Sequence, residues 1–180
     1  MAICNPTGSL SVTIREEIRL PNGNMEQSIN TEVITDVNQI MKRTDTIAPT
    51  FSGSGIEILK FVDSEEQQTA GSFVRDTVKY MRFTNLCSTN FLSLYLIQDS
   101  PEAQSPNTGN VGSGDESLFR LDAGKSMVFS NAQFQGTDYY DYVVEGYVDI
   151  QYFSSFASLS SIKAKADTAN VQIEYFVAYL

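Results

Sequence analysis

Alternation of apolar and polar residues with a period of two is the feature that most constrains how this chain folds. In residues 10–20, LSVTIREEIRL, apolar side chains at 10, 12, 14, 18 and 20 share one face, Arg15, Glu17 and Arg19 share the other, and Glu16 is the one misfit. Period two is the repeat of a β-strand, whose successive side chains point to opposite faces. No segment sustains the 3.6-residue repeat of an amphipathic helix. The pattern predicts an all-β protein that begins with a long, half-buried strand.

Turn chemistry follows this first strand. Pro21 precedes Asn22-Gly23, and Asn and Gly tolerate the positive φ that tight hairpin turns require. Residues 25–33 then resume the alternation, with Met25, Gln27, Ile29, Thr31 and Val33 on one face. We therefore predict that the first two strands pair in an antiparallel hairpin.

The rest of the chain repeats this strand-and-turn pattern. Further strands are predicted at 56–62, 78–84, 91–97, 118–121, 127–129, 139–153, 159–166 and 171–179. The pattern of residues 37–42 favours a strand over one helical turn. Only within 154–165 is a short helix an alternative to a strand. Many short strands indicate a sandwich or a barrel. We predict an antiparallel two-sheet β-sandwich, jelly-roll-like, with about nine or ten strands. Residues 1–9 are expected to form an N-terminal arm and residues 10–180 a single domain.

Charge and cysteine content narrow the possible partners. The 180 residues include 22 acidic and 12 basic ones, a formal charge of −10, which disfavours nucleic acid and anionic membrane surfaces. Cys4 and Cys87 match no metal motif, and we expect both to be free thiols. No apolar run approaches the roughly 18 residues of a membrane span, and no leader-like segment opens the chain. We expect a soluble protein without a membrane partner.

Gly124-Lys125-Ser126, within LDAGKSMVF, matches the end of a phosphate-binding loop. Such a loop requires a Gly five positions before Gly124 and a helix after it. Phe119 occupies that position, and the residues after Ser126 alternate as a strand. The stretch therefore predicts a tight turn between two strands, in which Gly124 supplies a conformation that residues with a Cβ resist.

Enzymatic chemistry has little support in the composition. The chain has no His, which excludes Ser-His and Cys-His relays and the common zinc sites. Carboxylates remain as candidates for acid-base catalysis or calcium binding, although their spacing is not that of an EF-hand. The candidate carboxylates are Glu16, Glu17, Glu65, Glu66, Asp115, Glu116, Asp138 and Asp141. We predict no cofactor, no metal and no catalytic site.

Two segments are candidates for partner contacts. Residues 99–116 are rich in Pro and Gly and read as a long surface loop, either simply exposed or in contact with a partner. The tyrosines of 139–153 read as core and cross-strand residues, or in part as a surface for protein or sugar. The candidate contact residues are Asn107, Asn110, Asp115, Glu116, Tyr139 and Tyr140.

Several motifs together resemble a family of small virion structural proteins of tailed, chiefly marine, bacteriophages. They are VTIREEIRLPNG (12–23), VKYMRFTNL (78–86), STNF (88–91), LDAGKS (121–126), ADTANV (166–171) and EYFVA (174–178). The resemblance spans most of the chain and implies a non-enzymatic role in the virion, assembled in the host cytoplasm. It leads us to expect a capsid decoration or cement protein, a homo-oligomer such as a trimer at a three-fold site, in contact with the major capsid protein. A tail or neck component is the alternative, and a carbohydrate-binding module is a third class.

Overall fold

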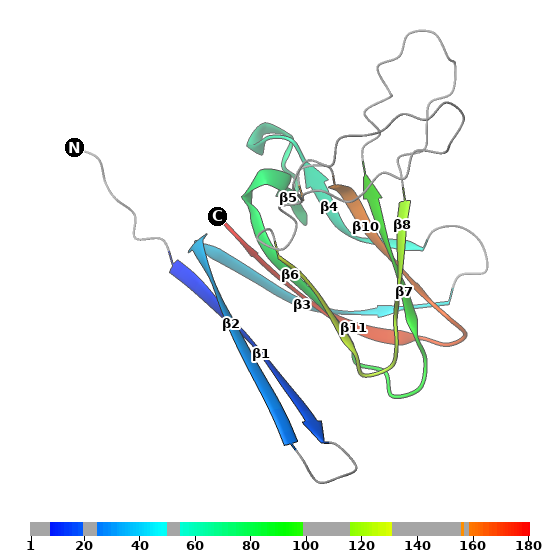
Figure 1. Ribbon diagram of the computed structural model, residues 1–180. Coiled ribbons are helices and arrows are strands. Elements are labelled where there is room, and N and C mark those ends of the chain that lie inside the picture. The colour runs from blue at the N-terminus through cyan, green and yellow to red at the C-terminus, as the bar shows by residue number, and fades with distance from the viewer. Residues whose placement is uncertain (1–7, 20–24, 50–54, 99–115, 131–155, 157–158) are drawn as a thin grey trace, which may run out of the picture.

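The chain folds as two β-sheets packed face to face, with a two-stranded hairpin beside them (Figure 1). This computed structural model describes residues 8–19, 25–49, 55–98, 116–130, 156 and 159–180. These residues hold eleven strands and two single-turn 3₁₀ helices, η1 (Glu65–Gln67) and η2 (Arg75–Thr77). The predicted all-β sandwich is confirmed.

Each sheet of the sandwich mixes strands from distant parts of the chain. The four-stranded sheet has the order β3 (Gln39–Ile47), β11 (Val171–Tyr179), β6 (Val78–Asn85), β9 (Ser126–Ser130). The five-stranded sheet has the order β5 (Ser72–Val74), β4 (Ile56–Val62), β10 (Leu159–Ala166), β7 (Leu92–Gln98), β8 (Glu116–Leu121).

Four nested antiparallel pairs generate this order. β7 pairs with β8, β6 with β9, β4 with β10 and β3 with β11, as if one long hairpin had been drawn along the chain. The hairpin is rolled up, so that β10 also pairs with β7 and β11 also pairs with β6. A rolled hairpin split between two sheets is the jelly-roll topology, which the sequence analysis predicted.

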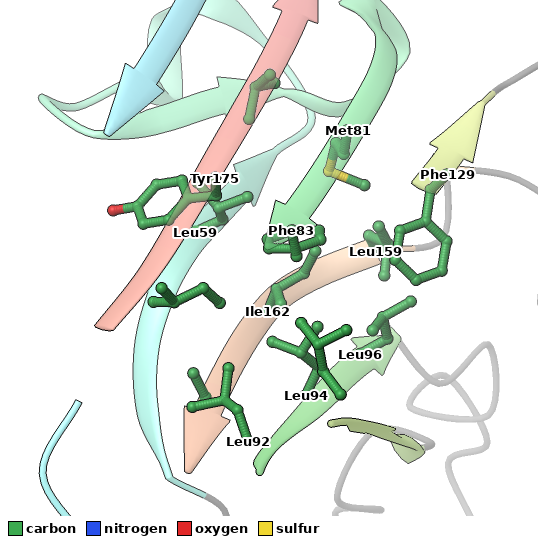
Figure 2. Close-up of a cluster of buried hydrophobic side chains, with 14 of the residues drawn as sticks. Leu59, Met81, Phe83, Leu92, Leu94, Leu96, Phe129, Leu159, Ile162 and Tyr175 are labelled. Carbon is green, nitrogen blue, oxygen red and sulfur yellow. The ribbon is translucent and has the colours of Figure 1, made fainter. Parts of the chain in front are cut away.

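The core lies between the two sheets, where the inward faces of the strands meet. Figure 2 shows Leu92, Leu94 and Leu96 of β7 gathered with Ile162, Leu159, Met81 and Phe83. The ring of Phe83 stacks near Tyr175, with centroids 6.4 Å apart, and meets Phe129 edge-on at 6.0 Å. Each fully buried side chain of this size stabilises the fold by roughly 1.5–3 kcal/mol.

Asn85 joins two turns at one end of the sandwich, the one after β6 and the one between β8 and β9. Its buried side-chain amide donates hydrogen bonds to the carbonyls of Asn90 (2.9 Å) and Leu121 (3.1 Å), and its Oδ1 accepts one from the Cys87 N–H (2.9 Å). Its backbone N–H donates to the Lys125 carbonyl at 2.9 Å. Because the oxygen and the nitrogen of this buried amide are both paired, their hydrogen bonds offset the cost of removing the amide from water.

The LDAGKSMVF stretch is the predicted tight turn. Lys125 N–H donates to the Asp122 carbonyl at 3.1 Å, which closes a β-turn, and Gly124 has φ +68° at its third position. The turn does not close a two-stranded hairpin, however, because β8 and β9 belong to different sheets. It carries the chain from one layer of the sandwich to the other.

Two features of the sandwich differ from the predicted pattern. β5 lies between the strands predicted at 56–62 and 78–84, where no strand was predicted, and it pairs in parallel with β4, so the five-stranded sheet is not wholly antiparallel. Ser72 and Phe73 are buried there, since a three-residue strand suffices to cover the end of β4. The strand predicted at 139–153 lies outside the described residues.

The first two strands form a sheet of their own. β1 (Gly8–Arg19) pairs antiparallel with β2 (Met25–Val37), as predicted, with Thr13 opposite Thr31. The expectation that the first strand is half-buried was wrong, because most of its described side chains are exposed, as are most of those of β2. Figure 1 shows the reason: the β1–β2 hairpin diverges from the sandwich, so no layer covers most of its length.

Candidate functional site

The β1–β2 hairpin is anchored to the sandwich at its base only. Val37, Tyr80 and Ala178 are buried together, packed against partly buried side chains from the hairpin and from the outer face of the four-stranded sheet: Leu10, Val12, Ile34, Val128 and Phe176. Tyr80 meets Phe176 edge-on, with ring centroids 5.9 Å apart. The sheet is therefore buried on both faces at this point, which explains why β6 has an aromatic residue, Tyr80, on its outer face.

Polar contacts reinforce this base. Ser130 Oγ donates a hydrogen bond to Glu32 Oε1 of β2 at 3.2 Å. Burial raises the pKa of Tyr80, the guanidinium of Arg82 opposes the rise, and the carboxylate of Glu32 adds to it. The hydrogen bond from Ser130 and the effect on Tyr80 both show that the Glu32 carboxylate lies beside the sheet. The base of the hairpin therefore combines an apolar contact with polar contacts at its edge.

A second charged group lies on the same face of the sheet. Glu174 accepts contacts from Lys42 Nζ and Arg82 Nη2, each at 2.9 Å, and its side chain is 18% exposed. The hydrogen bond from Lys42, with help from Arg82, holds the pKa of Glu174 below its usual value although partial burial opposes this. The guanidinium of Arg82 also lies 5.8 Å from the centre of the Phe176 ring. These contacts link β3, β11 and β6.

β2 runs almost without interruption into β3. Asn38 alone separates the two strands, and Asp36, near the end of β2, has φ +59°, a left-handed conformation that Asp tolerates better than most residues. Asn38 N–H then donates to the Tyr179 carbonyl at 3.0 Å and returns the chain to the four-stranded sheet. One nearly continuous strand thus serves both the sandwich and the projecting hairpin.

The projecting part of the hairpin exposes apolar side chains on both faces. Ile29 and Val33 are 61% and 60% exposed on one face, and Ile14 is 44% exposed on the other. Sequence reasoning placed Ile29 and Val33 on a common face but did not predict whether that face is buried or exposed. The available signal was that Gln27 and Thr31 share this face, so its apolar residues recur every four positions and not every two.

Most of the predicted partner contacts lie outside the described residues. This applies to Asn107, Asn110, Asp115, Tyr139 and Tyr140. Glu116 is described: it is exposed at the start of β8, opposite Ile97. Gln98, which precedes the first of the two segments that hold the candidates, is paired with Leu159, which follows the second.

The negative charge of the chain is unevenly distributed. From residue 38 onward, the described residues include ten basic and ten acidic side chains. Residues 8–37 contain five acidic and two basic residues, and segments 99–115 and 131–155 contain seven acidic residues and no basic one. The described sandwich is thus close to neutral, and the excess acidity belongs to the hairpin and the two long connections.

Cys87 is a free thiol in the turn after β6, as predicted; Cys4 lies outside the described residues. The backbone N–H groups of Thr89 and Asn90 lower the pKa of Cys87 to about 7. Within the described ranges, no three Cys, Asp or Glu side chains are grouped so as to hold a metal ion. None of the helices described there has the length and apolarity to cross a membrane.

Comparisons with protein-family models, with curated proteins and with solved structures found no match.

Proposed function

We propose that this chain is a structural component of a bacteriophage virion, most specifically a decoration or cement protein on the capsid. The observation that carries the proposal is the β1–β2 hairpin, which projects from a jelly-roll body with Ile14, Ile29 and Val33 exposed. A two-stranded ribbon in water is marginally stable, and exposed apolar residues clustered on one element are typical of a surface that meets a neighbour.

The location of the acidic residues supports an outer position. The hairpin and the segments 99–115 and 131–155 carry the excess negative charge, which is unfavourable near packaged nucleic acid and compatible with a contact between proteins. The resemblance to phage virion proteins points the same way. The major capsid protein and further copies of this chain are the partners of the proposal.

The test is binding of the purified protein to capsids that lack it. We expect saturable co-sedimentation with hundreds of copies per particle, and additional density at a symmetric position in imaged particles. Failure to bind such capsids would count against the decoration role. A count of a few to a few dozen copies would instead indicate a tail or neck component.

A further inference from the structure

Ile34 and Val37 of β2 face the same way although they are three residues apart. Val37 is buried with Tyr80 and Ala178 at the base of the hairpin, and Ile34 packs against the same cluster. In a regular strand, residues three positions apart point to opposite faces of the sheet. An extra residue must therefore interrupt the alternation of β2 between them.

The pairing with β1 locates this interruption. β1 has one residue between the partners of Ile34 and Val37. β2 has two residues at the same place, Thr35 and Asp36. Two residues opposite one form a β-bulge, which bends its strand and increases the local twist. Asp36 has the left-handed φ of +59°, and Figure 1 shows that the chain changes direction sharply between β2 and β3.

We propose that the bulge at Asp36 is a conformational device that sets the direction in which the β1–β2 hairpin leaves the sandwich. The cluster at the base holds the hairpin, and the bulge fixes its direction. Together they make the hairpin a fixed projection instead of a flexible tether. A fixed projection loses little conformational entropy when it binds a neighbour. This direction is a property of the isolated chain, so it is measured without capsids and does not depend on the proposed function.

The test measures distances between pairs of spin labels on the isolated full chain by double electron–electron resonance. Cys4→Ser and Cys87→Ser remove the native thiols. Ser28→Cys places one label at an exposed position of the hairpin, and Thr46→Cys or Lys60→Cys places the second at an exposed position of one or the other sheet. Ser28 is about eight residues, or about 26 Å of strand, from the bulge, so a change of about 20° in direction moves its label by about 9 Å.

Two variants separate the bulge from the rest of the strand. Deletion of Asp36 removes the extra residue, and Ile34 and Val37 then lie two positions apart and still share a face. We therefore expect the hairpin amides to stay protected from exchange while at least one label distance shifts by about 5 Å or more. Asp36→Gly is the matched control. It keeps the extra residue, and glycine accepts positive φ, so both distances are expected to match the narrow wild-type distributions.

Several results would overturn the proposal. A broad distance distribution in the wild type would show a flexible tether. Unchanged distances after the deletion would show that the bulge does not set the direction, and an equal shift in Asp36→Gly would assign the effect to the Asp36 side chain. Exchange of the hairpin amides about tenfold faster after the deletion would show that the extra residue serves the anchor. Failure of the wild type to bind capsids would reject only the proposed function.

Discussion

At the scale of single residues, Gly55 has the most restrictive environment among the glycines discussed. Its φ is +86°, and a Cβ there would collide with the Ala164 carbonyl oxygen of the neighbouring strand. We expect Gly55→Ala to lower the free energy of unfolding by more than about 2 kcal/mol, because strain and overlap add. Gly124→Ala is the control: it has φ +68° but open space, and is expected to cost about 1 kcal/mol. Equal losses in urea titrations would contradict the overlap argument.

Glu174 makes stability depend on pH in a defined direction. Its pKa is lowered in the folded protein, so its charged contacts with Lys42 and Arg82 stabilise the fold above the unfolded-state pKa, roughly 4.3, and this stabilisation is lost as the pH falls through the folded-state value. At pH 7, Glu174→Gln is expected to cost up to about 1 kcal/mol. Thermal melts across acidic pH should show the difference from wild type vanishing, whereas Glu65→Gln, at an exposed position on η1, should show little difference at any pH.

Cys87 is expected to react as a partly ionised thiol near neutral pH. Backbone hydrogen bonds lower its pKa to about 7, against roughly 8.5 for a free cysteine. In a Cys4→Ser variant, the rate of iodoacetamide alkylation should therefore rise with a midpoint near pH 7, which mass spectrometry can follow. A midpoint near that of an unstructured cysteine peptide would show that the turn does not stabilise the thiolate.

At the scale of elements, Val33 and Ile34 are adjacent residues of β2 with opposite environments. Ile34 packs against the buried cluster at the hairpin base, whereas Val33 is 60% exposed. Ile34→Asp would bury an unpaired charge, so we expect the hairpin to detach and its amide hydrogens to exchange about tenfold or more faster, while β6 and β11 stay protected.

Val33→Asp provides the control for this effect. Val33→Asp should leave hairpin exchange nearly unchanged, because Val33 is exposed and outside the cluster at the hairpin base. If both substitutions accelerate exchange equally, the cluster with Tyr80 and Ala178 does not anchor the hairpin.

At the scale of the whole molecule, β11 is the strand on which the four-stranded sheet depends. It pairs with β3 on one side and β6 on the other, and its inward side chains are fully buried. Deletion of residues 171–180 is therefore expected to abolish cooperative unfolding and near-ultraviolet circular dichroism. Removal of Leu180 alone, which is 46% exposed, should preserve both. A truncated chain that still melts cooperatively would show that the remaining strands form an independent core.

What the sequence determined by itself is local. Period-two alternation identified most of the described strands, and Gly124 with its neighbours identified a turn, because strand periodicity and turn conformation depend on residues a few positions apart. Periodicity could not predict which strands pair, since β3 and β11 are more than a hundred residues apart and pair only as part of the rolled-up hairpin. The exposure of Ile29 and Val33 could not be predicted for the same reason. Alternation shows that a strand has two faces, but only the packed sheets decide which face is covered, and the structure leaves most of the β1–β2 hairpin beyond the reach of any sheet.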